Sequence, residues 1–385
     1  MLTAYKVELN PTDQQKIKMA QTFGVCRFVY NLYLNHNKEI YEADKKFISG
    51  YDFSKWLNNE FIPSTPSYQW IKDVGSKAVK KSIMNAEVAF KNFFKGQTEF
   101  PKHKNRSSHK SFYFPRNNKK DVEVCRHKIK IPTLGFVRLK EFGYAPEGIN
   151  AKSVTVSQVA DRYYVSVVYE AGNRTMQYVS NKEAIGIDLG VKNTAIVSNG
   201  MIFKNINKTS KIKKIEKKLK REQRAFSRKL QNKKRNKQRS DTANIRKNKM
   251  RIAKIHARLS RIRKEYIRYI VNSLVKANSL PAYVSIEDLN VSGMLKNKYL
   301  SKSIKEQLFY YFKQYLMQKC KKYDVEVRVI DRWYPSSKMC HGCGQINPNL
   351  KLSDRKYVCD CGYVEDRDVN ASLNIKDCNK YELAS

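Results

Sequence analysis

The chain has 385 residues, of which 41% are hydrophobic, enough for two or three domains that each bury a core. Lysine and arginine number 76 against 35 aspartates and glutamates, which gives a formal net charge of +41. This excess is larger than solubility requires and is typical of proteins that neutralise phosphates. A polybasic protein of a membrane surface would concentrate its charge on one amphipathic element, whereas every third of this chain is basic.

The sequence has no stretch close to the roughly 18 uninterrupted apolar residues of a membrane span, and its start lacks a signal-peptide pattern. We therefore expect a cytoplasmic protein with no membrane partner. Thiols stay reduced in the cytosol, so the eight cysteines are expected as metal ligands or core residues and not as disulfides. Four isolated cysteines are expected to be buried thiols: Cys26, Cys125, Cys320 and Cys378.

The first part of the chain changes from strand to helix and back to strand patterns. Residues 2–9 alternate like a β-strand, and Asn10 and Pro11 predict the N-cap and first turn of a helix. Helical patterns rich in aromatics continue to about residue 96, and most of these aromatics are expected in a helical core. Strands are then predicted over HKIKIP, LGFVRLKEF, KSVTVSQ and RYYVSVVYE. This order predicts a small β-barrel interrupted by a helical lobe.

A third pattern begins after Ser180. Three short strands, EAIGIDLG, NTAIVS and MIFKNI, are joined by tight turns, and Asn199-Gly200 in the second turn is a hairpin signal. A long helical region, the strand AYVSIEDL, one helix over residues 303–322, the strand VEVRVID and a helix over DVNASLNIKDC follow. The order β-β-β-α-β-α-β-α is that of an RNase H-like nuclease core.

The long helical region is strongly basic. Residues 208–270 hold 26 lysines or arginines against four acids, a net charge of +22. Apolar residues three and four apart mark one face of each of two helices, and residues 236–244 read as a turn between them. A solvated helix usually mixes charge signs, so the nearly pure positive sign favours nucleic-acid contacts. We predict such contacts at Lys217, Arg221, Arg224 and Arg228.

Four cysteines form two short knuckles. Two residues separate Cys340 from Cys343, and after fifteen further residues one residue separates Cys359 from Cys361. Four thiolates brought together in this way predict a tetrahedral Zn²⁺ site. Because the protein fills all four positions, the zinc is expected to be structural and not catalytic. His341 lies between the first two cysteines and is expected to be a loop residue.

Carboxylates form a second constellation. Asp188 closes the first strand after Ser180, Glu287 ends the fourth, and Asp366 and Asp368 lie at the start of the last helix. Carboxylates at strand ends and at a neighbouring helix start can converge on Mg²⁺. Two such ions about 4 Å apart activate water and stabilise the leaving oxygen in phosphodiester hydrolysis. Alternation places Glu287 and Asp288 on opposite faces, whereas geometry alone leaves the choice between Asp366 and Asp368 open.

These motifs together resemble those of the TnpB family, transposon-encoded RNA-guided nucleases that are ancestral to type V CRISPR effectors. The resemblance spans nearly the whole chain and rests on GIDLGVKN, IEDLNVSGM, SSKMCHGCG and DRDVNASLNI. It implies that Asp188, Glu287 and Asp368 are the RuvC-type catalytic triad and hold two Mg²⁺ ions. The implied domains are a wedge β-barrel (1–10 and 108–181), a helical recognition lobe (11–107), a RuvC nuclease domain (182–335 and 364–385, with a basic helical hairpin at 208–270) and a zinc ribbon (336–363).

The resemblance also implies the partners. A guide RNA (omega RNA) from the transposon end would pair with one strand of double-stranded target DNA beside a short transposon-adjacent motif. A monomer in the cytoplasm of a prokaryote is expected. The second knuckle, CDC, departs from the more familiar CxxC, which leaves room for a different metal geometry. In the recognition lobe we predict nucleic-acid contacts at Tyr51, Lys77, Lys80 and Lys81.

Three alternatives stay open. A guided DNA-binding transcriptional repressor would gain nothing from converging carboxylates beside phosphates. A cut-and-paste transposase of the Asp-Asp-Glu type is disfavoured because the acids occur here in the order Asp, Glu, Asp. A miniature type V CRISPR effector nuclease would be distinguished by neighbouring genes.

Overall fold

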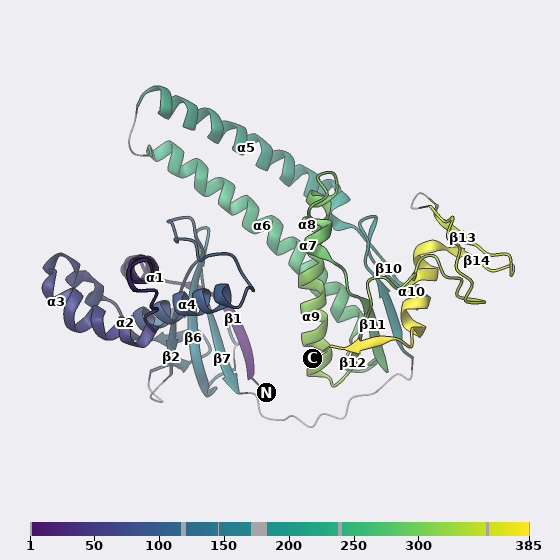
Figure 1. Ribbon diagram of the computed structural model, residues 1–385, viewed down its shortest axis with the longest axis horizontal. Coiled ribbons are helices and arrows are strands. Elements are labelled where there is room, and N and C mark those ends of the chain that lie inside the picture. The colour runs from purple at the N-terminus through teal and green to yellow at the C-terminus, as the bar shows by residue number, and fades with distance from the viewer. Residues whose placement is uncertain are drawn as a thin grey trace. The chain divides into compact units, whose positions relative to one another are not determined.

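The computed structural model describes residues 2–116, 121–144, 146–170, 183–237, 241–351 and 354–384. They belong to two compact units, Met1–Arg174 and Thr175–Ser385, each of which is described by itself (Figure 1). Within the described residues, no helix is both long enough and apolar enough to cross a membrane.

The first unit contains a seven-stranded antiparallel sheet in the order β2-β6-β7-β1-β5-β4-β3. Buried residues of β2 and β3, at the two ends of this order, share one core with the central strands. Strands β2 and β3 lie outside the four segments predicted as strands from residue 110 onward. The strands are β1 (Leu2–Asn10), β2 (Lys110–Pro115), β3 (Glu123–Val124), β4 (Lys128–Ile131), β5 (Gly135–Leu139), β6 (Ala151–Val159) and β7 (Arg162–Glu170).

Helices fill the segment between β1 and β2. They are α1 (Asp13–Asp44), α2 (Gly50–Trp56), a π-helical turn (Leu57–Phe61), α3 (Ile62–Ser64), a 3₁₀ segment (Pro66–Asp73) and α4 (Ser76–Phe94). The N-cap of α1 is Thr12, so the prediction of Asn10 is wrong. The Thr12 hydroxyl accepts a hydrogen bond from the Gln15 N–H, and the Gln15 side chain accepts one from the Thr12 N–H. This capping box satisfies two backbone donors, which Asn10 at the end of β1 does not do.

The early aromatics mostly form the predicted helical core. Tyr33 is fully buried, its ring lies 5.0 Å from that of Phe53, and its hydroxyl donates to the Ile48 carbonyl. Tyr41 is an exception, since it is 46% exposed and Lys45 lies over its ring.

The second unit is built on a mixed six-stranded sheet in the order β10-β9-β8-β11-β12-β15. Strands β8, β11 and β12 are parallel, so their carboxyl ends meet at one edge of the sheet. Strand β15 was not predicted. The strands are β8 (Ile185–Asp188), β9 (Asn193–Val197), β10 (Ile202–Lys204), β11 (Tyr283–Glu287), β12 (Glu326–Ile330) and β15 (Tyr381–Leu383), with a separate hairpin of β13 (Lys356–Val358) and β14 (Val364–Asp366).

The helices of this unit are α5 (Ser210–Arg235), α6 (Ala243–Leu274), α7 (Val291–Met294), α8 (Ser301–Gln307), α9 (Phe309–Lys322) and α10 (Arg367–Asp377), and a 3₁₀ turn (Ile206–Lys208) precedes α5. Helices α5 and α6 run side by side, in teal and green in Figure 1, and share buried apolar residues. The single helix predicted over residues 303–322 is wrong. Two helices, α8 and α9, are separated at Leu308, whose φ of 55° lies in the left-handed region. Leu308 packs against the sheet core, which outweighs the local helix pattern.

The strand alternation divides the sheet into two faces. Ile187 and Ile286 point to the core shared with α6 and α9. Gly186, between Ile185 and Ile187, faces α10 on the other side. The last helix, α10, therefore lies on the face of the sheet opposite to the core with α6 and α9.

Helix α10 approaches β8 too closely for any side chain at Gly186. A Cβ placed there would lie 2.2 Å from the Ser372 carbonyl oxygen and 2.5 Å from the Lys376 nitrogen. Both atoms belong to the backbone of α10, so relief requires the whole helix to move. The glycine in GIDLG is thus needed for helix packing.

Gly186→Ala should therefore destabilise the second unit, by about 3 kcal/mol or more, because overpacking against backbone is not relieved by rotamer changes. Urea unfolding of the second unit measures this loss. Gly24→Ala in α1 is the matched control, because a Cβ there meets nothing within 4 Å. Equal stability of the two variants would contradict the packing argument.

Candidate active site

Strand order brings two carboxylates to one edge of the second sheet. Ile187 pairs with Ile286 in the parallel β8–β11 ladder, so Asp188 and Glu287 follow at equivalent ends. Along their strands, both acids come directly after residues that point into the core with α6 and α9. Their side chains therefore lie on the opposite face of the sheet, which α10 covers. Asp368 is the second residue of α10. Two strand ends and one helix start thus place the three acids near enough for the charges of Glu287 and Asp368 to act on Asp188.

The negative charges of Glu287 and Asp368 affect the pKa of Asp188. Burial, together with the charges of Glu287 and Asp368, raises the pKa of Asp188 to about 8, while the Arg367 guanidinium opposes the rise. Burial also raises the pKa of Glu287, and the hydrogen bond from Ser336 opposes it. Half-buried carboxylates that repel one another favour protonation or a bound cation. Such a group is typical of a functional site.

Two of the three acids, Glu287 and Asp368, also have protein contacts. The Ser336 hydroxyl donates to Glu287 Oε1. Arg367 Nη2 lies 2.9 Å from Asp368 Oδ1, and both side chains are largely shielded from solvent. These two carboxylates are therefore held in place by the chain and are not freely rotating surface groups.

The neighbouring acids have different contacts. Asp288 accepts hydrogen bonds from Lys313 and Arg332, which lower its pKa, so it points away from Glu287 as the alternation predicts. Asp366 is the N-cap of α10, and its side chain accepts from the backbone N–H groups of Asp368 and Val369. Helix capping explains Asp366 without a metal.

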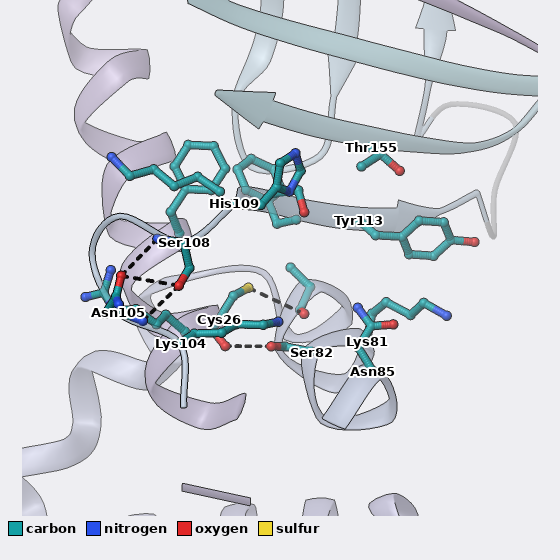
Figure 2. Close-up of a pocket in the computed structure, with 16 residues that line it drawn as sticks. Cys26, Lys81, Ser82, Asn85, Lys104, Asn105, Ser108, His109, Tyr113 and Thr155 are labelled. Carbon is teal, nitrogen blue, oxygen red and sulfur yellow. Dashed lines mark hydrogen bonds between the residues drawn. The ribbon is translucent and has the colours of Figure 1, made fainter. Parts of the chain in front are cut away.

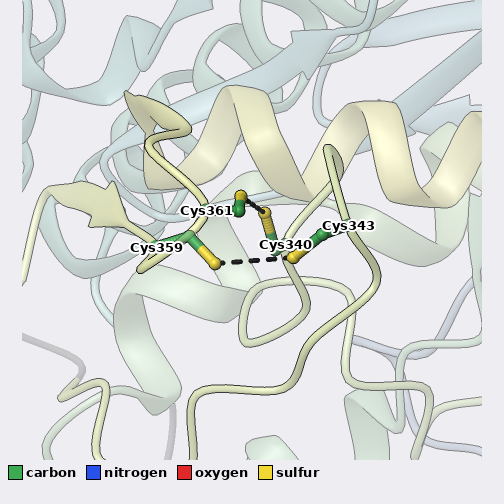
Figure 3. A group of neighbouring side chains, drawn as sticks. All are labelled: Cys340, Cys343, Cys359 and Cys361. Carbon is green, nitrogen blue, oxygen red and sulfur yellow. Dashed lines mark hydrogen bonds between the residues drawn. The ribbon is translucent and has the colours of Figure 1, made fainter.

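The four predicted zinc ligands come together (Figure 3). Their sulfur atoms all lie within 4.8 Å of one another. The Sγ atoms of Cys340 and Cys361 are 3.7 Å apart, and those of Cys343 and Cys359 are 3.6 Å apart. Tetrahedral zinc with Zn–S bonds of about 2.3 Å requires sulfur separations of about 3.8 Å. The cluster fits a structural zinc ion, and the CDC knuckle does not prevent this geometry.

The other cysteines are mostly as predicted. Cys26, Cys320 and Cys378 are buried, whereas Cys125 is half-buried, so the prediction for Cys125 is wrong. Cys125 lies just after β3, at an end of the first sheet, where fewer residues cover it.

A basic pocket of about 200 Å³ lies in the first unit between α1, α4 and β2 (Figure 2). Arg27, Lys81, Lys104 and Lys110 contribute to its lining, which contains no acid among the described residues. Burial lowers the pKa of Lys104, whose Nζ lies 3.5 Å from the centre of the Tyr30 ring. The size and charge of the pocket suit one phosphate group. Sequence patterns identified only Lys81, because the other cations are scattered along the chain.

The remaining contacts predicted in the lobe occupy a mixed surface. Tyr51 is 55% exposed, with Lys55 and Lys80 over its ring at 4.7 and 5.2 Å. Lys77 forms an ion pair with Asp121 at 3.2 Å. Tyr51 and Lys80 thus present an aromatic ring beside positive charge, whereas part of the Lys77 charge is neutralised within the protein.

Helix α5 exposes one basic face. Its buried residues Ile212 and Ile215 pack toward α6. The four predicted contacts are exposed and recur at helical spacing, which makes a continuous positive stripe. They are Lys217, Arg221, Arg224 and Arg228.

Three family models match the chain. Residues 166–298 match an IS605 OrfB model described as "Probable transposase", residues 309–375 match a "Cas12f1-like, TNB domain", and residues 1–46 match a "Helix-turn-helix domain". The described part of residues 1–46 forms strand β1 and the single long helix α1. This segment is therefore not a pair of helices joined by a turn.

Similar proteins extend over nearly the whole chain. One from Escherichia coli (strain K12), "Putative RNA-guided DNA endonuclease InsQ", is 32% identical and covers 97% of this chain and 91% of its own length. The chain belongs to the TnpB family. A relative from Streptomyces pristinaespiralis, "Putative RNA-guided DNA endonuclease", is 30% identical, with 97% and 88% covered. The solved "Cryo-EM structure of the Cas12f1-sgRNA-target DNA complex" is 15% identical, with 98% and 99% covered and a TM-score of 0.35.

Loss of one zinc thiolate should release the metal. Cys361→Ser is expected to lower the zinc content well below one ion per chain and to loosen the β13–β14 hairpin, because a hydroxyl is a much poorer zinc ligand. Metal analysis of the purified protein measures this. Cys125→Ser, outside the cluster, should keep full zinc content, and zinc retained equally by both variants would contradict the assignment.

Asp188 should make stability depend on pH in the absence of Mg²⁺. Its pKa rises from 3.8 to about 8 on folding, so its stabilising contribution is complete below the ordinary value and is lost as pH rises through about 8. Asp188→Asn removes this loss, and the variant should gain stability over the wild type as pH increases. Urea unfolding between about pH 5 and 9 tests it. Parallel pH profiles of the two proteins would count against a buried ionisable group at this position.

Proposed function

We propose that the protein is an RNA-guided endonuclease that cleaves double-stranded DNA by hydrolysis of phosphodiester bonds. The observation that carries the proposal is the gathering of Asp188, Glu287 and Asp368 at one sheet edge, in a chain of the TnpB family. A binding protein has no use for acids that repel both one another and a nearby phosphate.

Asp188, Glu287 and Asp368 would hold two Mg²⁺ ions. Bound there, these ions would supply an activated water and charge stabilisation at the leaving oxygen. Asp188 and Glu287 are placed by hydrogen-bonded parallel strands, which keeps their separation fixed. Asp368 comes from the N-terminal turn of α10, where Arg367 holds its carboxylate. On this proposal, the chain would position three anionic ligands before substrate arrives.

The positive charge is proposed to bind nucleic acid. A guide RNA from the transposon end would occupy basic surfaces such as the α5 stripe and pair with one DNA strand beside a short transposon-adjacent motif. The pocket containing Lys81 and the surface at Tyr51 would contact nucleic-acid backbone or bases. The two relatives described above carry names that support RNA guidance and DNA cleavage.

The proposed architecture follows the same family. The seven-stranded sheet with its helical insertion would be a wedge β-barrel and recognition lobe, and the six-stranded sheet would be a RuvC nuclease core. The four-cysteine segment between β12 and α10 would be an inserted zinc ribbon. A monomer in the cytoplasm of a prokaryote completes the proposal.

Cleavage of RNA-matched double-stranded DNA in Mg²⁺ tests this function. Asp188→Asn, Glu287→Gln and Asp368→Asn should each reduce the rate by on the order of 10³-fold or more, about 4 kcal/mol of barrier, because each removes an anionic metal ligand. Single-turnover rates with the copurified RNA provide the measurement.

Two neighbouring acids serve as matched controls. Asp288→Asn and Asp366→Asn should leave the rate within a few-fold, because Asp288 binds Lys313 and Arg332 and asparagine is also a good N-cap at 366. Guided binding of DNA by the wild type without cleavage would instead favour a transcriptional repressor.

A further inference from the structure

Ser336 is a buried serine whose hydroxyl faces the candidate active site. It is 7% exposed and lies in the loop between β12 and the first zinc knuckle. Its hydroxyl donates to Glu287 Oε1, at the end of β11. This bond occupies one oxygen of the carboxylate and limits the rotation of the Glu287 side chain, while Oε2 is not used by it.

The same loop is fixed from the other side by α10. Asn374, 2% exposed, donates through Nδ2 to the carbonyls of Ser336 at 2.8 Å and Met339 at 2.7 Å. Asn370, fully buried, donates to the Met339 carbonyl at 2.8 Å and accepts from the His341 N–H at 3.0 Å. Satisfied buried networks of this kind are rigid, because each broken bond leaves a buried polar group without a partner.

This network connects three places that lie far apart in the sequence. His341 follows the zinc ligand Cys340 directly. Asn370 follows Asp368 by two residues on α10. Glu287 therefore shares one hydrogen-bonded unit with a zinc knuckle and with the helix that carries Asp368.

We propose that Ser336 is a positioning residue for Glu287 and that the buried amides of Asn370 and Asn374 connect it to the zinc ribbon. The inference rests on the proposed function, in which Glu287 binds a divalent cation. The hydroxyl aligns the carboxylate, and the ribbon holds the loop that carries the hydroxyl. Zinc binding thereby supports divalent-ion binding at the carboxylate site, although none of the four zinc-binding cysteines is a ligand there.

The expected effect is that of removing a hydrogen bond to a metal ligand. Losing such a partner typically costs 10–100-fold in metal affinity. Ser336→Ala frees Glu287 to rotate, so binding must then also restrict that side chain. Cleavage should require correspondingly more Mg²⁺, with the rate at saturating Mg²⁺ restored to within a few-fold of wild type. A residue that served only to stabilise the fold would lower that saturating rate in proportion to the unfolded fraction.

The test is titration of the zinc-loaded full chain, with its copurified RNA, with Mn²⁺, following free Mn²⁺ by electron paramagnetic resonance. Ser336→Ala should bind Mn²⁺ roughly 10–100-fold more weakly with unchanged zinc content. Ser336→Thr keeps a hydroxyl and should recover most of the affinity. Ser337→Ala, at the half-buried neighbouring position, is the matched control and should match wild type.

Wild-type Mn²⁺ affinity in a folded, zinc-loaded Ser336→Ala protein would overturn the proposal. If Ser336→Ala does not fold, Asn370→Ala leaves the Ser336 hydroxyl in place but removes the bond to His341 and one of the two bonds to the Met339 carbonyl, and it should weaken Mn²⁺ binding in the same direction. Unchanged affinity in that variant also overturns the proposal. Mn²⁺ binding that is insensitive to Glu287→Gln would instead refute the proposed function, and the role of Ser336 with it.

Discussion

The close packing of α10 on β8 at Gly186 is the constraint on which the second unit depends. Only a residue without a Cβ lets the helix backbone lie against the strand, and that distance places the start of α10 beside the strand end. The same helix presents Asn370 and Asn374 to the loop of the zinc ribbon. One glycine therefore determines both where Asp368 lies and how the ribbon is attached. The remaining parts of the site are arranged around this contact.

Much of this arrangement could be predicted because it is encoded locally. Strand alternation placed Glu287 and Asp288 on opposite faces, and cysteine spacing is sufficient to indicate a zinc site. The break at Leu308 could not be predicted, because tertiary packing there overrides a continuous helical pattern. Ser336 carries no sequence signal either, since its partner is 49 residues away and its burial arises only in the folded loop. Local pattern specifies elements, whereas contacts between distant segments specify the environment of each side chain.

The acids and the bases of this chain are separated in space for a physical reason. Arg367 is the cation that lowers the pKa of Asp188, and it is paired with Asp368. The large positive excess lies instead on α5 and α6, whose buried residues form a stripe between the two helices and, in the C-terminal part of α6, part of the sheet core. Cations placed among the carboxylates would neutralise them and weaken their attraction for divalent ions. Cations on a long helical pair can meet many phosphates at once.

The position of α10 near the end of the sequence also orders the events of synthesis. Asp188 leaves the ribosome about 180 residues before Asp368, which at roughly 5–20 residues per second is a delay on the order of 9–36 s. The basic helices α5 and α6 are synthesised within this interval, before α10 is available to cover the face of β8 around Gly186. A nascent chain would therefore present its cationic helices to nucleic acid before the three proposed catalytic carboxylates are all present. The proposed nucleic-acid surface is thus complete earlier than the proposed catalytic cluster.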